Sequence, residues 1–149
     1  MSIKFKKLHA DAKLPTRAHR TDAGMDVYTI EDVVVPPRGD AITGLGIASA
    51  FDDDHALLVF NKSGRATKLK LDKGAEVIDS GYRGEIHVHL FNHSDEPAVI
   101  KKGEKIAQLL LVKIWNGQPE EIDLIDEAPE GWDDQTERGT GGFGSTGLK

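Results

Sequence analysis

The sequence contains no cysteine, and this absence removes several kinds of chemistry. Without thiols the chain cannot form disulfides, bind a metal through thiolates or use a cysteine nucleophile. Hydrophobic runs are also short, since none approaches the ~18 residues of a membrane span, and we expect no membrane contact. The first residues, MSIKFKKLHADAKLP, hold no apolar stretch typical of a signal peptide. These features together predict a cytoplasmic protein.

Positive charge is in deficit: 19 Lys and Arg face 25 Asp and Glu, which gives a formal net charge of −6. A negative balance argues against a general binder of nucleic-acid backbone. The 149 residues suit one domain. Glycine is plentiful instead, because 16 residues exceed the usual share of about 7%.

Turn-forming clusters such as PPRGD and KSGR recur about every ten residues, with short β-prone runs such as HALLVF between them. The segment 85–91, EIHVHLF, alternates most clearly, with Ile86, Val88 and Leu90 on one face. The segment 105–114 is compatible with a buried strand or a short helix, and its neighbours favour a strand. The pattern predicts an all-β protein, jelly-roll-like, built as a barrel or sandwich.

One short helix is expected after KSGR. Ser63 is predicted as its cap, Gly64 as its first residue, and Asp72-Lys73-Gly74 as its end. Lys62, Ser63 and Arg65 would then lie where exposed N–H groups favour phosphate. A turn with solvated charges is the alternative.

The last 24 residues change character, since 126–149 contain six glycines, six acids and few apolar side chains. Such a segment cannot bury enough surface to order itself. We therefore predict a β domain over 1–125 and a flexible arm over 126–149. Within the arm, RGTGGFGSTG lacks the Lys-Ser/Thr of a Walker loop. It is predicted either as a solvated tail or as a phosphate-binding flap with an aromatic lid.

Two aspartates sit beside turn signals. Asp79 precedes Ser80-Gly81, a pair able to make a hairpin, and Tyr82 and Arg83 are expected at the start of the next strand. At such a place a carboxylate can hold a water as general base, or merely cap the turn. Asp26, in AGMDVYT, is expected in a similar tight glycine turn.

Three histidines, His87, His89 and His93, invite a metal interpretation. His87 and His89 share a strand face, but His93 falls beyond the strand. A solvated strand face is therefore favoured over a metal site.

The order of the weak motifs is more informative than any one of them. AGMDVYT, KSGRATK, VIDSGYRGE, GEKIAQLLL and RGTGGFGSTG together resemble the five motifs of the homotrimeric deoxyuridine triphosphatases, over nearly the whole chain. The resemblance implies a jelly roll that assembles as a threefold trimer with sites between subunits, each covered by another subunit's arm. It also implies Mg²⁺-dependent hydrolysis of dUTP to dUMP and pyrophosphate by water attack on the α-phosphate, which keeps uracil out of DNA and supplies dUMP.

The resemblance assigns roles by position. Asp79 corresponds to the carboxylate that activates the water, and Tyr82 to the ring packed under the deoxyribose. Backbone groups of the hairpin at 75–86, Val77 among them, correspond to the uracil-reading edge, and Asp26 to the acid that holds Mg²⁺ through water. The residues implied to contact the phosphates or to close over the nucleotide are Lys62, Ser63, Gly64, Gln108, Arg138, Phe143, Gly144, Ser145 and Thr146.

The sequence departs from the family's common pattern in the second and third motifs. Asn61-Lys62-Ser63 stands where Pro-Arg-Ser is common, and Lys cannot make the planar contact of Arg. Arg65 is a candidate to share that task. Glu76 stands where Gly is frequent, and Ser80 follows Asp79 where many members carry a second acid.

Two alternatives remain. A deoxycytidine triphosphate deaminase of the same fold would need a glutamate acting on the pyrimidine, and Glu85, expected on the following strand, is the candidate. A non-catalytic jelly roll that senses nucleotide or binds a protein is the other. Bacterial, phage and viral members look alike in these motifs.

Overall fold

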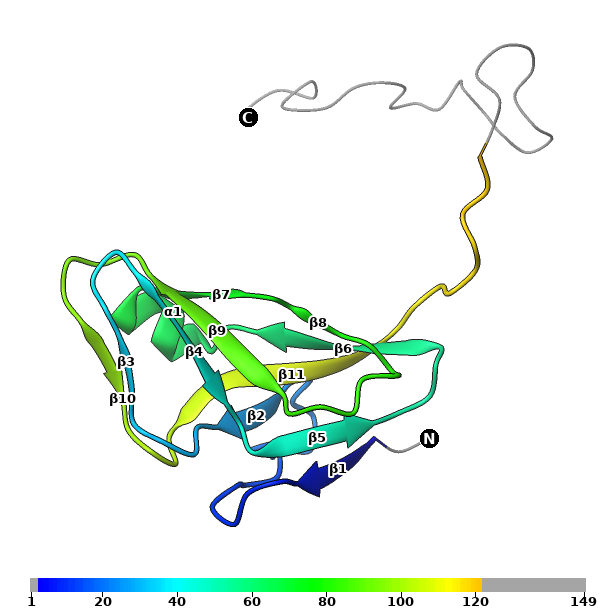
Figure 1. Cartoon of the computed structure of the whole chain (residues 1–149), viewed down its shortest axis with the longest axis horizontal. Coiled ribbons are helices and arrows are strands. Elements are labelled where there is room, and N and C mark those ends of the chain that lie inside the picture. Colours follow the sequence, from blue (N-terminus) through cyan, green and yellow to red (C-terminus); the bar gives the residue numbers. More distant parts are fainter. Residues whose placement is uncertain (1–2, 122–149) are drawn as a thin grey trace. The chain divides into compact units, whose positions relative to one another are not determined.

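The computed structural model describes residues 3–121, and these form short strands with a single helix. Figure 1 shows their order along the chain. The elements are β1 (Lys4–Lys7), β2 (Met25–Tyr28), β3 (Val33–Val35), β4 (Asp40–Gly44), β5 (Ile47–Ala50), β6 (His55–Phe60), α1 (Ser63–Leu69), β7 (Leu71–Gly74), β8 (Val77–Ile78), β9 (His87–Asn92), β10 (Ala98–Ile100) and β11 (Lys105–Lys113). Residues 3–121 are therefore all-β with one short helix, as the turn spacing predicts.

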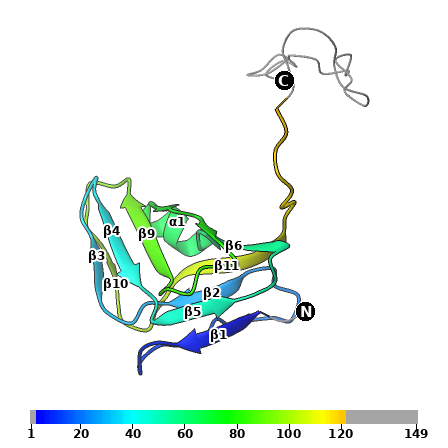
Figure 2. The same ribbon diagram turned by 45° about the vertical axis from the view of Figure 1, so that its right-hand side comes forward.

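Most neighbouring strands in space are distant in sequence. The largest sheet has the order β2-β11-β6-β8, a second has β4-β9-β7, and β1-β5 and β3-β10 form two-stranded pairs, with every pairing antiparallel. Figure 2, turned by 45°, keeps β1 beside β5 and β3 beside β10. Such crossovers between antiparallel strands are characteristic of jelly rolls and sandwiches.

One hydrophobic cluster joins the sheets. In β9 the buried residues alternate as predicted, since Val88 and Leu90 are buried while His87 is exposed. The segment 105–114 is confirmed as a strand, β11, with Ile106, Ala107 and Leu109 buried. It lies between β2 and β6, so its apolar side chains pack into the core. β11 is thus the strand from which the site is best described.

The helix exists, but its predicted boundaries are wrong. Lys62, not Ser63, is the N-cap residue, and it makes no side-chain capping bond. Ser63 is already helical, and the helix ends at Leu69 because Lys70 adopts a left-handed conformation with φ of 54°. Residues 72–74 belong to strand β7 instead. Local sequence signals miss this end because a left-handed conformation costs energy for lysine, and a lysine therefore does not normally mark the end of a helix. Tertiary contacts offset that cost here.

The hairpin around Asp79 is also wider than the Ser80-Gly81 pair suggests. β7 pairs with β9, and the connection between them carries β8, which pairs with β6. Tyr82 and Arg83 therefore lie in this connection and not at a strand start, since β9 begins only at His87. Asp26 likewise lies within β2 and not in a glycine turn.

The chain divides into two units, Met1–Asn116 and Gly117–Lys149. The arm predicted over 126–149 lies outside the described residues, and the boundary predicted at 125 stays a prediction. Within residues 3–121, no helix has the length and apolar character required to cross a membrane.

Candidate active site

Asp26 is the buried acid of the candidate site. It sits in the middle of β2 with only 6% of its surface exposed. Its Oδ1 accepts a hydrogen bond from Lys62 Nζ at 2.5 Å, and its Oδ2 lies 2.6 Å from Lys105 Nζ. One lysine comes from the helix start and the other from β11, so the carboxylate links three segments far apart in the sequence.

These contacts decide the charge of Asp26. Burial alone raises the pKa of its carboxyl, but hydrogen bonds from Lys105 and Lys62 and the charges of both lysines hold the pKa below its usual range. The pKa of Lys105 is raised because it donates a hydrogen bond to Asp26 and feels its charge. Near neutral pH the site therefore contains one carboxylate and two ammonium groups, with a surplus of positive charge.

Gln108 brings three of the predicted motifs together. In the register of the central sheet it lies opposite Asp26 on one side and opposite Phe60 on the other. Its Nε2 donates to the carbonyl of Asn61 at 2.8 Å. Gly24 leaves room for it, because a Cβ there would lie 2.1 Å from Gln108 Oε1. The glycine of AGMDVYT is thus required by a close approach.

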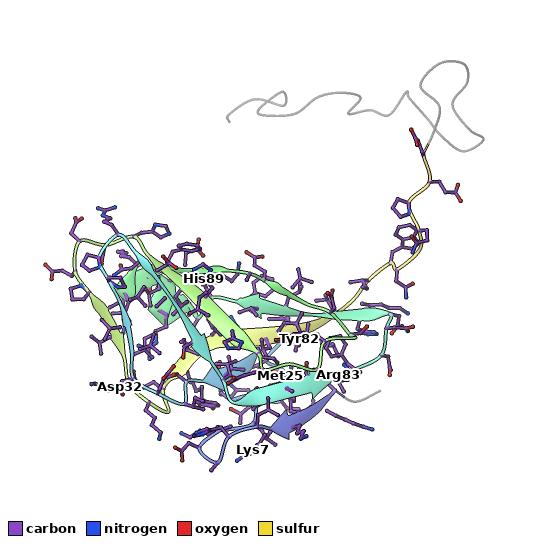
Figure 3. The ribbon with its side chains drawn as sticks, in the orientation of Figure 1. Lys7, Met25, Asp32, Tyr82, Arg83 and His89 are labelled. Atoms are coloured by element: carbon purple, nitrogen blue, oxygen red, sulfur yellow. The ribbon has the colours of Figure 1, made fainter. Side chains whose placement is uncertain are left out.

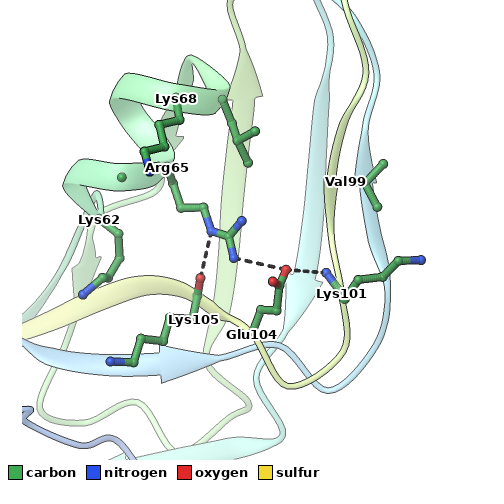
Figure 4. Close-up of a pocket in the computed structure, with 9 residues that line it drawn as sticks. Lys62, Arg65, Lys68, Val99, Lys101, Glu104 and Lys105 are labelled. Carbon is green, nitrogen blue, oxygen red and sulfur yellow. Dashed lines mark hydrogen bonds and ion pairs between the residues drawn. The ribbon is translucent and has the colours of Figure 1, made fainter.

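A cavity of about 530 Å³ lies beside α1. Figure 4 shows the helix on one side and Val99 and Lys101 on the other, with the Lys101 side chain directed away from the helix. The lining residues are Lys62, Gly64, Arg65, Lys68, Leu69, Val99, Lys101, Glu104 and Lys105. Five of them are cationic and one is acidic. Three of the lysines are paired with Asp26 or Asp32, and the positive surplus that remains still suits an anion.

The positions predicted for nucleotide contact at the second motif line or border this cavity. Lys62 and Gly64 line it, while Ser63 is exposed at the first position of the helix. Nothing lies within 4 Å of where a Cβ of Gly64 would be, so the backbone there is open to a ligand.

Asp79 begins a turn directly after β8, and its side chain is exposed. Its carbonyl accepts the amide of Tyr82 at 3.1 Å. Tyr82 Oη donates to the carbonyl of Glu85 at 2.9 Å, which fixes the direction of a ring that is 44% exposed. Figure 3 labels Tyr82 and Arg83 side by side in this connection. Val77 is likewise exposed, at 64%.

The structure does not bring Asp79 to Asp26 and Lys62 within one chain. Ile78 pairs with Leu57, so Asp79 lies toward the His55 end of β6, while Lys62 follows the opposite end. Lys62 is five positions along the chain from Leu57, and at ~3.3 Å per residue this is a span of roughly 15–20 Å. A single copy therefore presents two halves of a site at different places.

Other predicted groups have structural partners. The Glu85 carboxylate accepts a hydrogen bond from the amide of Gly46 at 2.7 Å. Glu85 was expected on the following strand, but it lies before β9, which begins at His87. His89 Nε2 lies 2.8 Å from Asp40 Oδ2. Within residues 3–121, no group of three or more His, Asp or Glu side chains is arranged to hold a metal.

Some participants were missed by sequence reasoning. Lys105 and the ion pair of Arg65 with Glu104 were not assigned, because only the register of β11 reveals them. The predicted arm residues Arg138, Phe143, Gly144, Ser145 and Thr146 lie outside the described residues.

Comparison with known proteins places this geometry in context. The dUTPase family model matches residues 10–147. The mitochondrial deoxyuridine 5'-triphosphate nucleotidohydrolase of Dictyostelium discoideum is 40% identical over 148 residues, which cover 99% of this chain and 78% of that protein. The dUTPase of Staphylococcus bacteriophage 80alpha, solved with dUpNHpp, is similar with a TM-score of 0.86 at 28% identity, over 99% of both chains.

A further solved relative shares the fold. A mutant dUTPase from phage phi11 of S. aureus, described with a coordinated structural Mg(II) ion, has a TM-score of 0.77 at 24% identity. The match covers 84% of this chain and 99% of that one.

Proposed function

This chain belongs to the dUTPase family, and from that premise we propose that it hydrolyses dUTP to dUMP and pyrophosphate by attack of water on the α-phosphate. The reaction removes a precursor of uracil in DNA and supplies dUMP. The observation that carries the proposal is the cavity beside Asp26, Lys62 and Gln108, whose surplus of positive charge suits a triphosphate.

In this proposal Asp79 orients and activates the attacking water. Its carboxylate is exposed at a turn, so it is accessible to a bridging water and to the deoxyribose. Tyr82 supports the sugar, and the hydrogen bond from its hydroxyl to the carbonyl of Glu85 fixes the direction of its ring. The exposed edge at 75–86, Val77 included, reads the uracil through backbone groups.

The complete site is proposed to form between copies of the chain. Asp79 and the Asp26–Lys62–Gln108 group stand roughly 15–20 Å apart along β6 at ~3.3 Å per residue. A triphosphate with its sugar is too short to use both halves of one copy. A homotrimer, in which one copy gives Asp79 and another the phosphate contacts, resolves this separation.

Asp26 is proposed to hold, through water, a magnesium ion that arrives with the nucleotide. It is ionised, but both carboxylate oxygens are taken by ammonium groups, so it offers no bare ligand. Mg²⁺ keeps much of its water shell and is usually held by one or two carboxylates together with substrate phosphates. When bound, the ion would neutralise phosphate charge, and Asp26 would contact it through water.

The arm is proposed to close over the nucleotide. Arg138, Ser145 and Thr146 would bind the outer phosphates, Gly144 would allow a close backbone approach, and Phe143 would cover the uracil. Closure would expel water other than the attacking one. We also propose a cytoplasmic location. The Dictyostelium relative is named as mitochondrial, so localising a tagged chain in its native cell tests this point.

The decisive experiment is a pyrophosphate assay with dUTP, UTP, dTTP and dCTP, with and without Mg²⁺. We expect release from dUTP only, and loss of turnover but not of binding in Asp79→Asn. Ammonia release from dCTP would overturn the proposal in favour of a deaminase. Binding of dUTP without pyrophosphate release would favour a non-catalytic module. A light-scattering mass of one chain would contradict the trimer.

A further inference from the structure

Arg65 is held in a fixed orientation at the wall of the cavity. Its Nε donates to the carbonyl of Lys105 at 3.0 Å, and its Nη2 lies 3.2 Å from Glu104 Oε2. Figure 4 shows both contacts, which tie the guanidinium to the start of β11. The side chain is 22% exposed, so it is neither buried nor free in solvent.

The two contacts leave most of the guanidinium unoccupied. Arginine carries five N–H donors in a rigid plane, and only two are used within residues 3–121. The remaining three belong to a side chain that lines the same cavity as Lys62 and Gly64. A planar group already oriented loses little freedom on binding, which favours its use as a ligand contact.

Lys62 is poorly placed to supply this contact alone. Its ammonium is bound to the buried Asp26 at 2.5 Å, so reaching a phosphate means sharing or breaking that bond. An ammonium is also a point charge, whereas a guanidinium matches two phosphate oxygens at once. The cavity therefore has two cations bound to Asp26, Lys62 and Lys105, and beside them one arginine with donors still unused within residues 3–121.

We propose that Arg65 binds the outer phosphates of the nucleoside triphosphate through these free donors. The inference rests on the proposed function, since it takes a triphosphate to be the occupant of the cavity. Arg65 is then a substrate-binding residue that recognises phosphate-chain length, and it takes no part in activating the water. The competing role is a structural one, in which Arg65 only joins α1 to β11 through Glu104.

Three variants separate these roles. Arg65→Leu removes the guanidinium. Glu104→Gln breaks the ion pair but keeps the guanidinium. Lys113→Leu is the control, because it removes a positive charge from the far end of β11. Affinities for dUpNHpp and for dUMP are measured by calorimetry, together with KM and kcat for dUTP. Melting temperatures check that each variant is folded.

We expect Arg65→Leu to weaken dUpNHpp binding by about 10- to 100-fold, the usual range for losing a charged hydrogen-bonded contact. Binding of dUMP should change little, because it has no outer phosphates. Lys113→Leu should bind dUpNHpp within a few-fold of the wild type, and Glu104→Gln should lose less affinity than Arg65→Leu because it keeps the guanidinium. Arg65→Lys, which keeps charge and stem, should fall between them and serves if Arg65→Leu does not fold.

Equal loss in Arg65→Leu and Glu104→Gln would overturn the inference, since it would assign Arg65 to the structural link. So would unchanged dUpNHpp affinity in Arg65→Leu or Arg65→Lys, or equal weakening of dUMP and dUpNHpp. Failure of the proposed function, hydrolysis of dUTP, would give a different result from failure of the Arg65 inference. In that case the wild type releases no pyrophosphate from dUTP, whatever Arg65 contributes to binding.

Discussion

Replacing Asp26 by Asn tests the central ion cluster. The carboxylate is 8% exposed, but its partners Lys62 and Lys105 are 29% and 44% exposed. Breaking a fully buried pair typically costs about 3–5 kcal/mol. Here water screens the two ammonium groups that lose their carboxylate partner, so we expect a loss of about 2 kcal/mol in the free energy of unfolding at pH 7. For a chain of this size that lowers Tm by roughly 4–8 °C.

The pH dependence gives the sharper test. Because the folded-state pKa of Asp26 lies below its ordinary value, its stabilisation is present above the unfolded pKa of about 4. It is lost as pH falls through the lowered folded pKa, whereas Asn does not titrate. In thermal melts followed by circular dichroism, the difference in Tm between wild type and Asp26→Asn should therefore become smaller as the pH falls into the acid range. An equal Tm at pH 7, or a gap that stays constant into the acid range, would refute the reasoning.

Three further changes have expected outcomes. Gly24→Ala puts a Cβ 2.1 Å from Gln108 Oε1, so the side chain must swing away, and steady-state kinetics should show a raised KM with little change in Tm. Tyr82→Phe loses the hydroxyl bond to Glu85, and denaturant unfolding should show a cost of about 0.5–1.5 kcal/mol with turnover largely kept. Deleting 138–149 should leave a trimer by light scattering and cut turnover severely; an unchanged kcat would exclude the flap role.

Much of the fold could be predicted because the signals are local. The alternation at 85–91 requires one face inward, and the structure buries Val88 and Leu90 accordingly. Turn clusters rich in glycine and aspartate interrupt the chain often enough to exclude long helices. Boundaries were less reliable: α1 ends where Lys70 takes a left-handed conformation, which no local signal indicates for lysine.

The candidate site was predicted by motif and completed by register. Asp26, Lys62 and Gln108 were chosen for their chemistry, and the structure brings them together around β11. Lys105 was missed because its role depends on reaching Asp26 across a strand pair with an irregular register. The sequence offered Arg65 only as a candidate for phosphate contact, and the structure adds the hydrogen bond to the Lys105 carbonyl that orients its guanidinium.

The sequence by itself determined the element types, the shortage of positive charge and the order of the five motifs, since these depend on residue identity and short-range periodicity. Only the tertiary structure decided which carboxylate is shielded by two lysines, and that Asp79 stands at the opposite end of β6 from Lys62. Antiparallel strands can pair in many registers, and a shift of one residue turns a side chain to the other face. The collective packing of the core selects one register, so the geometry of the site follows from the whole fold.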